Sequence, residues 1–284
     1  AWQAAWMKTH HPADFLAAVL THGKGFYSPL AYSLECRLLG IGFLPPDINL
    51  RHPCFLPESP SAIRVPLSAI KGLSQQLQAT LQEKNIREFA SIADFAESTN
   101  SAESDLRLLL RVGAFDSLGF SRTEGIWQIR KYIIQCHDMQ SIDDIKHSET
   151  SEKIDRLKDE MELLGFTVSG HPLELWPDVA WDTYCPIDTL AAHTGRRVTI
   201  CGLVIADRQH HQSDGQAMKF LSLCDHSGII ETEMFAAAFR RFGLETLRHP
   251  VLEITGTVVP FDGNIGYSLR IESVRRPRRR GEVR

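Results

Sequence analysis

The spacing of apolar residues changes about two thirds of the way along the chain. Before this point, apolar side chains recur every three or four residues, as at Leu106, Leu109 and Leu110, which is the pattern of amphipathic helices. From Arg196 onward, apolar residues alternate with other residues, as they do along 198–204, and this alternation is typical of β-strands. We therefore predict a helical first part and a β-rich second part.

The helical part begins with two predicted helices and a small sheet. Pro12 suits the first turn of a helix, whose apolar residues then fall on one face. Residues 30–39 predict a second helix. A short apolar run at 41–44 ends at Pro45-Pro46 and predicts a strand, which we expect to pair with residues 62–67.

Helical spacing returns between residues 68 and 145. The stripe formed by Ile126, Ile129 and Ile133 predicts one long helix there. A polar, acidic stretch at 140–152 is interpreted as a connector. A further amphipathic helix is predicted over 154–164, and we expect it to end at Gly165 because glycine is the usual residue after a helix.

The β-rich part contains five alternating segments in a characteristic order. Residues 236–247 predict a helix between the third and the fourth segment, while Asp214-Gly215 and Asp262-Gly263 predict turns. Three strands, a helix and two more strands in about 80 residues is the order expected of an OB-fold barrel. The five segments lie at 198–204, 218–222, 230–234, 252–258 and 267–271.

Composition and charge narrow the class of protein. The 284 residues carry a formal net charge of −4, which argues against a protein wrapped in DNA over its whole surface. The sequence contains no apolar run of the roughly 18 residues that a membrane span needs, and no basic and then apolar leader. We therefore expect a cytoplasmic protein without a membrane partner. The arginine-rich residues 277–284 form a basic tail that either attracts phosphates or is simply solvated.

Cysteine and histidine spacing does not favour a metal site. The six cysteines are scattered and form no C-x-x-C pair, whereas a zinc ribbon needs close pairs. The adjacent histidines at 10–11 and 210–211 have diverging side chains. We expect reduced thiols, no metal ligands and no cofactor in this chain.

The first candidate binding element is the glycine-containing segment Ile70-Lys71-Gly72-Leu73-Ser74. A hairpin that opens a helix presents free backbone N–H groups, which can hold a phosphate. Lys71 adds a positive charge beside Gly72. We therefore predict DNA contacts at Lys71, Gly72 and Ser74; the alternative is that Ser74 only caps the helix that follows.

The second candidate is the predicted barrel, because OB-folds bind single strands with a basic groove and stacking rings. We predict DNA contacts at Arg208, Lys219 and Arg270. Arg240 and Arg241 are further basic candidates. The aromatic candidates are Phe220, Phe235, Phe239, Phe242 and Tyr267, and the alternative for each ring is packing inside the barrel, since most occupy positions that alternation assigns to the core.

Three short blocks, taken in order, resemble a known family. They are Lys71-Gly72-Leu73, the stretch from Gly113 to Gly119, and the stretch from Leu164 to Leu173. With the helices between them and the β-rich part after them, they resemble the C-terminal region of the bacterial DNA polymerase III α-subunit family. The family's hairpin usually carries G-x-G; Ser74 stands at the second glycine, which predicts a weaker grip on duplex DNA.

The resemblance extends to the start of the chain. Trp2 to Leu20 resembles the end of the fingers region, and residues 25–29 and 45–49 are most similar to the error-prone branch. The sequence also ends soon after the barrel. The implied fold is α+β and multidomain, with a helical fingers and helix-hairpin-helix region followed by a five-stranded OB-fold barrel. The expected divisions are 1–67 (end of the fingers), 68–145 (helix-hairpin-helix), 146–190 (connector), 191–276 (OB-fold) and 277–284 (basic tail).

The resemblance also implies a function. The chain would position primer-template and single-stranded DNA for DNA-templated synthesis, in replication and in damage-tolerant translesion repair. Its partners would be DNA and other polymerase or sliding-clamp subunits. The carboxylates that hold two metal ions for nucleotidyl transfer belong to an upstream palm domain in this family. We therefore predict no catalytic residue here, no activity of this chain alone, and a need for Mg²⁺ only together with a palm.

Two alternatives remain open from the sequence. The chain could be a stand-alone OB-fold module that binds single strands or regulates another polymerase by docking on it. It could also be a metal-dependent hydrolase, which would require a bound ion.

Overall fold

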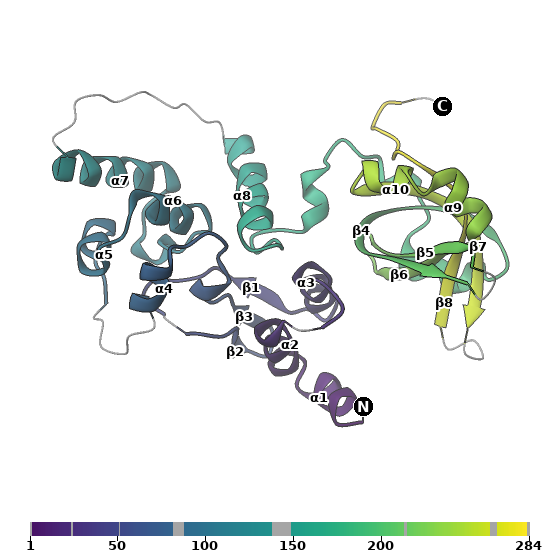
Figure 1. Ribbon diagram of the computed structural model, residues 1–284, viewed down its shortest axis with the longest axis horizontal. Coiled ribbons are helices and arrows are strands. Elements are labelled where there is room, and N and C mark those ends of the chain that lie inside the picture. The colour runs from purple at the N-terminus through teal and green to yellow at the C-terminus, as the bar shows by residue number, and fades with distance from the viewer. Residues whose placement is uncertain are drawn as a thin grey trace. The chain divides into compact units, whose positions relative to one another are not determined.

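In the computed structural model, the described residues are 2–23, 25–50, 52–81, 88–137, 149–212, 215–261 and 266–282. The chain divides into two compact units, Ala1–Leu175 and Trp176–Arg284 (Figure 1). Each unit has its own cluster of buried apolar residues. The predicted acidic connector at 140–152 and the two predicted turns fall largely or wholly outside the described residues.

The first unit is mainly helical. Proline occupies the first turn of two of its helices, and the Ser91 hydroxyl accepts a hydrogen bond of 3.1 Å from the Asp94 N–H at the start of a third. The described helices are α1 (Trp2–His10), α2 (Pro12–His22), α3 (Pro29–Leu38), α4 (Gln75–Leu81), α5 (Ile92–Thr99), α6 (Glu103–Arg111), α7 (Arg122–His137) and α8 (Glu149–Leu163), with short 3₁₀ helices at Leu67–Ala69, Asp116–Leu118 and Pro172–Leu175.

A small sheet packs with these helices. Its strands are β1 (Gly42–Leu44), β2 (Leu56–Ser59) and β3 (Ala62–Arg64), in the order β1-β3-β2. Strand β1 runs parallel to β3, with Phe43 opposite Ile63, so the predicted pairing of 41–44 with 62–67 is confirmed. The core beneath includes Phe95, whose ring contacts Phe115 edge-on at 5.6 Å.

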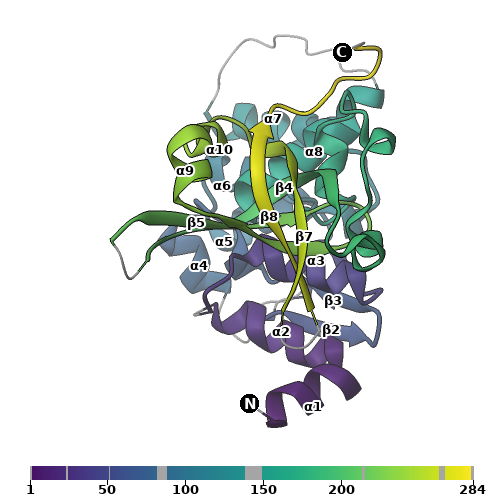
Figure 2. The same ribbon diagram turned by 90° about the vertical axis from the view of Figure 1, so that its right-hand side faces the viewer.

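The second unit contains a closed barrel in the order β4-β5-β6-β8-β7. Figure 2 shows its strands together with the helices that lie between the third and fourth of them. The parallel pairing of β6 with β8 closes the barrel. The elements are β4 (Arg197–His211), β5 (Ala217–Cys224), β6 (Ile229–Met234), α9 (Ala236–Phe242), α10 (Glu245–Arg248), β7 (Val251–Phe261) and β8 (Gly266–Arg275), preceded by 3₁₀ helices at Trp181–Thr183 and Ile187–His193.

This architecture confirms the predicted fold, a helical region followed by a five-stranded OB-fold barrel. One detail differs, because the helix predicted over 236–247 is two short helices separated at Gly243. The barrel also recruits residues before its first strand: Ile187 and Leu190 belong to its core.

The described part of the basic tail, which ends at Glu282, is hydrogen-bonded to residues near the start of the second unit. The Ala180 N–H donates to the Arg278 carbonyl at 3.0 Å, and the Arg280 N–H donates to the Asp178 carbonyl at 2.8 Å. Asp178 also pairs with the Arg279 side chain at 3.4 Å. The two ends of the unit are therefore joined through the backbone, although Arg276, Arg279 and Arg280 stay exposed. Within the described chain, no helix combines the length and the apolar character that a membrane crossing requires.

Candidate nucleic-acid interface

The first hairpin presents Lys71 and Gly72 between two buried anchors. Ile70 and Leu73 are 2% and 6% exposed, whereas Lys71 and Gly72 lie at the surface. Gly72 has φ of +89°, a backbone conformation that favours glycine. The Lys71 N–H donates to the Leu163 carbonyl at 2.9 Å, so the hairpin is fixed to the end of α8.

Ser74 is an exposed residue whose hydroxyl and N–H form hydrogen bonds within the protein. Its hydroxyl accepts from the Leu77 N–H at 3.2 Å, and therefore caps α4. The same hydroxyl and the Ser74 N–H donate to the two carboxylate oxygens of Asp105 at 2.6 and 2.9 Å. Asp105 is 2% exposed. Ser74 therefore caps α4, and its predicted DNA contact stays a prediction, because the residue is exposed while its hydroxyl and its N–H both donate to this carboxylate.

Two backbone N–H groups of the hairpin have no acceptor within the described part of the chain. Among the described residues, neither the Gly72 N–H nor the Leu73 N–H has a hydrogen-bond acceptor within the protein. The Lys71 ammonium lies 3.2 Å from the point where a Cβ on Gly165 would stand, and Gly165 has φ of +84°. The first and third sequence blocks thus meet here, with a cation beside two free donors.

The second block, 113–119, forms a packed turn. Phe115 is fully buried, and the Ala114 carbonyl accepts from the Ile48 N–H at 3.1 Å. Asp116 pairs with Arg156 of α8 at 2.7 Å. The interpretation of Asp116 as a turn residue agrees with its position at the start of a 3₁₀ helix.

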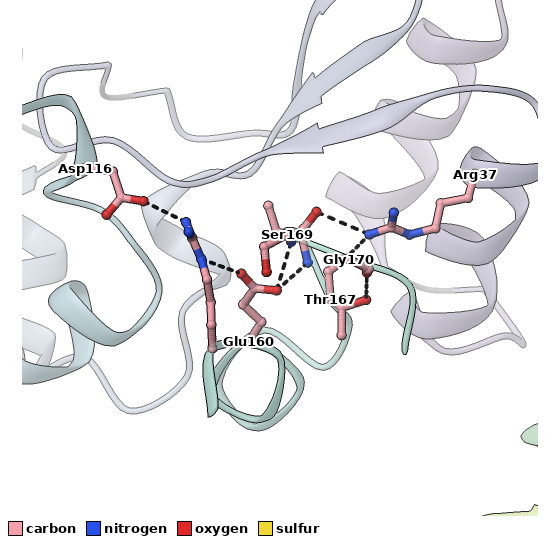
Figure 3. A network of polar contacts seen from close by, with 8 residues as sticks. Arg37, Asp116, Glu160, Thr167, Ser169 and Gly170 are labelled. Carbon is pink, nitrogen blue, oxygen red and sulfur yellow. Dashed lines mark hydrogen bonds and ion pairs between the residues drawn. The ribbon is translucent and has the colours of Figure 1, made fainter. Parts of the chain in front are cut away.

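A buried glutamate holds the third block in place. Glu160 is fully buried, and its Oε2 accepts from the Val168 and Ser169 N–H groups at 2.7 and 3.0 Å (Figure 3). Its other oxygen lies 3.5 Å from Nε of Arg156, the residue that pairs with Asp116. The network therefore ties α8, the second block and the third block together.

Arg37 of α3 completes this network from the other side. Its Nη2 donates to the carbonyls of Thr167 and Val168 at 2.8 and 3.2 Å (Figure 3). Burial, which outweighs the opposite effect of Glu160 and Glu174, lowers the pKa of Arg37. Arg37 and Glu160 were not predicted from the sequence, because charged residues on helices usually face solvent and no motif marks these two.

One row of residues crosses four strands of the barrel. Arg208 on β4 is paired with Phe220 on β5, Phe220 with Glu233 on β6, and Glu233 with Arg270 on β8. Side chains at paired positions share a face of a sheet. Phe220 is half-buried and the two arginines are 38% and 52% exposed at their side chains. The row therefore lies on the outer face of the barrel.

Nearby carboxylates partly neutralise the positive charge of this row. Nη2 of Arg208 donates to both carboxylate oxygens of Glu231 at 3.1 and 3.2 Å. Arg270 stands 5.0 Å from the centre of the Phe235 ring and 4.0 Å from the Glu233 carboxylate. The face offers one half-buried ring, one arginine stacked on a second ring, and little net charge.

Lys219 does not reach this face. It is 4% exposed, and its ammonium donates to Asp207 at 2.6 Å and to the Thr246 hydroxyl at 2.8 Å. The predicted DNA contact at Lys219 is wrong, because this residue shares the inward face of β5 with Leu221. Phe220 has the opposite parity and points outward, so the core-packing alternative fails for it. Phe239, Phe242 and Tyr267 do pack against the barrel core.

Metal-binding and reactive groups are not gathered in the described parts of the chain. No group of three or more His, Cys, Asp or Glu side chains there could hold a metal ion. Burial raises the pKa of Cys36 and of Cys224 to about 12, and also raises that of Cys201. These thiols stay protonated at neutral pH and are suited to packing rather than to nucleophilic chemistry.

Comparison with known proteins agrees with this geometry. A family model described as "Helix-hairpin-helix motif" matches residues 40–125. The chain is 29% identical over 241 residues to the DNA polymerase III subunit alpha of Aquifex aeolicus, covering 83% of this chain and 21% of that protein. It is 28% identical over 278 residues to the error-prone DNA polymerase of Idiomarina loihiensis, covering 93% of this chain and 26% of that protein. The resemblance to the polymerase III α-subunit family is confirmed.

The similarity to the polymerase III α family concerns part of a longer protein, since the chain spans 21% and 26% of these two relatives. Replicative and error-prone members match at nearly equal identity, so identity does not separate the two branches. The second OB-fold domain of replication protein A from Methanococcus maripaludis is 21% identical and covers 29% of this chain and 84% of that chain, with a TM-score of 0.21. The OB-fold assignment rests on the strand order and closure of the barrel.

Proposed function

We propose that this chain is the DNA-binding portion of a polymerase III α-type DNA polymerase. The observation that carries the proposal is a helix-hairpin-helix motif followed by a closed OB-fold barrel, in a chain similar to polymerase III α over most of its length. In the intact enzyme it would position primer-template DNA and the single-stranded template for DNA-templated synthesis. Mg²⁺ would be held by carboxylates outside this chain.

The hairpin would contact the phosphates of the duplex. Two free N–H groups, at Gly72 and Leu73, and the Lys71 ammonium are the donors that support this role. Because Asp105 accepts from the hydroxyl and the N–H of Ser74, these two donors are not free, and the hairpin presents fewer free donors than a G-x-G hairpin does. We expect weak and strongly salt-dependent duplex binding, because few phosphates are contacted.

The outer row of the barrel would contact the single strand. A base can stack on Phe220, while Arg208 and Arg270 approach neighbouring phosphates. Because Glu231 and Glu233 lie between the arginines, stacking would contribute more than charge. The salt dependence of single-strand binding should therefore be shallower than that of duplex binding.

Fluorescence anisotropy with a labelled oligo-dT and a labelled primer-template tests both contacts in the full chain. Phe220→Ala should weaken oligo-dT binding about tenfold, since a stacked ring is worth roughly 1–3 kcal/mol. Lys71→Glu should weaken primer-template binding and lower its salt slope. Phe26→Ala, which removes a ring 62% exposed in the first unit, and Lys131→Glu are matched controls. If both DNA affinities are unchanged in Phe220→Ala and Lys71→Glu, the proposed interface is wrong.

The error-prone, translesion role is a finer proposal, supported by the resemblance of residues 25–29 and 45–49 to that branch. Cytoplasmic location and contacts with other polymerase or clamp subunits are proposals of the same kind. Primer extension with this chain alone, Mg²⁺ and all four nucleotides should give no incorporation. Joining an upstream palm should restore synthesis; a stand-alone binding module would bind DNA equally well but gain no activity from the fusion.

A further inference from the structure

A hollow of about 580 Å³ lies in the second unit, between α9, α10 and the end of β8. Figure 1 shows α9, α10 and β8, the elements that carry most of its lining residues. The hollow combines guanidinium groups with an aromatic ring and an aliphatic side chain. Its lining residues are Arg241, Phe242, Glu245, Val274, Arg275 and Arg276. None of them belongs to the row from Arg208 to Arg270.

Two of the arginines that line the hollow form no ion pair with another described residue. Glu245 is neutralised by Arg248 at 2.7 Å, and Arg276 pairs with Glu282 at 2.5 Å. Arg241 and Arg275 are exposed, and neither forms an ion pair with another described residue. The Arg241 guanidinium lies 5.1 Å from the centre of the Phe242 ring. The hollow therefore presents positive charge that the described chain does not balance.

Exposed apolar side chains lie at the same helix. Leu244 at the start of α10 and Leu247 within it are each 71% exposed. Isolated exposed leucines are ordinary on protein surfaces, but these two flank Glu245, which lines the hollow together with Phe242 and Val274. Apolar surface next to polar residues is the arrangement of protein-binding sites.

We propose that this basic hollow binds a short acidic segment of a partner protein, in which carboxylates flank bulky apolar side chains. The carboxylates would pair with Arg241 and Arg275 as bidentate acceptors, and an apolar side chain would cover Phe242 and Leu247. A DNA backbone would satisfy the arginines alone and leave the leucines exposed, so the mixed surface favours a peptide. This proposal does not depend on DNA binding by the barrel.

The probe is a labelled peptide in which two phenylalanines are flanked by aspartates, titrated with the full chain by fluorescence anisotropy. Reversing both charges, Arg241→Glu with Arg275→Glu, should weaken binding about tenfold. The matched control, Arg196→Glu with Lys131→Glu, removes the same charge from exposed sites without ion pairs among the described residues, and should bind as the original chain does. Thermal melts establish that each variant is folded.

The apolar half of the proposal has its own test. Leu247→Ser should lose severalfold affinity for the phenylalanine peptide, but little for a peptide with serines in place of the phenylalanines. Competition with unlabelled oligo-dT separates the two kinds of partner. If oligo-dT binds through Arg241 and Arg275 while the peptide does not, or if neither probe responds to the double variant, the peptide site is refuted.

Discussion

At the scale of single residues, two buried carboxylates accept hydrogen bonds that hold the short sequence blocks in place, and no motif marks either of them. Asp105 takes the donors of Ser74, and Glu160 takes the N–H groups of Val168 and Ser169. A buried N–H without an acceptor costs free energy, so each carboxylate stabilises a backbone turn that has no partner in regular structure. The family's short blocks keep their shape through residues that lie outside them.

Glu160→Ala should lower the free energy of unfolding by about 3 kcal/mol, because the buried Val168 N–H and the partly buried Ser169 N–H lose their acceptor, at roughly 1–3 kcal/mol for a buried group. Urea unfolding measures the loss. Glu160→Gln keeps one acceptor oxygen and should cost less. Glu162→Ala, whose carboxylate is 64% exposed and pairs with Arg111, should cost under about 1 kcal/mol. Equal effects of Glu160→Ala and Glu162→Ala would contradict this role.

Cys36 should make stability fall at high pH. Burial, together with the nearby Glu35 charge, raises the pKa of its thiol from 9.0 to about 12. The unfolded thiol ionises first, so its contribution is complete below pH 9 and is lost progressively up to pH 12, at about 1.4 kcal/mol per pH unit. Urea unfolding of Cys36→Ala should therefore show a shallower decline above pH 9. Ser33→Ala, a buried non-ionising neighbour, should decline as the original chain does; identical slopes for both variants would exclude Cys36 as the source.

At the scale of elements, the sequence predicts which helices and strands exist better than it predicts which of their side chains face the core. Helical spacing and alternation identified most of the helices, two strands of the small sheet and the order of the barrel strands, because each pattern reflects one buried face; α5 and β2 were not predicted. Strand β5 shows the limit. Met218 and Phe220 suggest one buried face, but Leu221 and Leu223 occupy the other and are the true core. With apolar residues on both faces, alternation alone cannot assign Lys219.

Only those parts of the candidate site that depend on the backbone of a few consecutive residues could be predicted from the sequence. Gly72 could be placed at a hairpin because positive φ is a property of one residue. The Asp105 contact with Ser74 joins positions 31 residues apart, and the row from Arg208 to Arg270 depends on strand register across the closed barrel. Such long-range relations leave no periodic signal in a single sequence.

Gly256 should be indispensable to the pairing of β7 with β8. A Cβ there would stand 2.2 Å from the Arg270 carbonyl oxygen, at the point where the register of the two strands shifts. Since a backbone atom must move, Gly256→Ala should cost about 3 kcal/mol or more. Gly195→Ala has positive φ but open space, and should cost about 1 kcal/mol. Thermal unfolding compares the two; a Gly256→Ala variant as stable as Gly195→Ala would show that the strands separate easily.

At the scale of the whole molecule, the chain consists of two units, each with a core of its own. The limits of the second unit were not visible from alternation. Residues 176–190 have neither helical nor strand periodicity, yet Tyr184 donates to Glu253 at 2.8 Å and accepts from the Arg278 N–H at 2.6 Å. The latter contact joins positions 94 residues apart, so the barrel includes both of its flanking segments.

A fragment of residues 176–282 should therefore fold, whereas 196–274, the span of the strands alone, should be much less stable. The shorter fragment loses Ile187 and Leu190 from the core, at roughly 1.5–3 kcal/mol for each buried side chain. It also loses Tyr184 and Arg278, two groups that contact Glu253, a carboxylate that is 4% exposed. Removing these two partners from a buried carboxylate lowers the stability of the shorter fragment further.

Circular dichroism and urea unfolding of the two fragments measure the difference. Tyr184→Phe in the longer fragment is the graded control, because it keeps the ring and removes only the hydroxyl, and it should cost about 1–3 kcal/mol. The longer fragment should also bind oligo-dT as the full chain does, since the row from Arg208 to Arg270 lies entirely within it. If 196–274 unfolds at the same urea concentration as 176–282, the strands close the barrel unaided and the flanking segments serve another purpose.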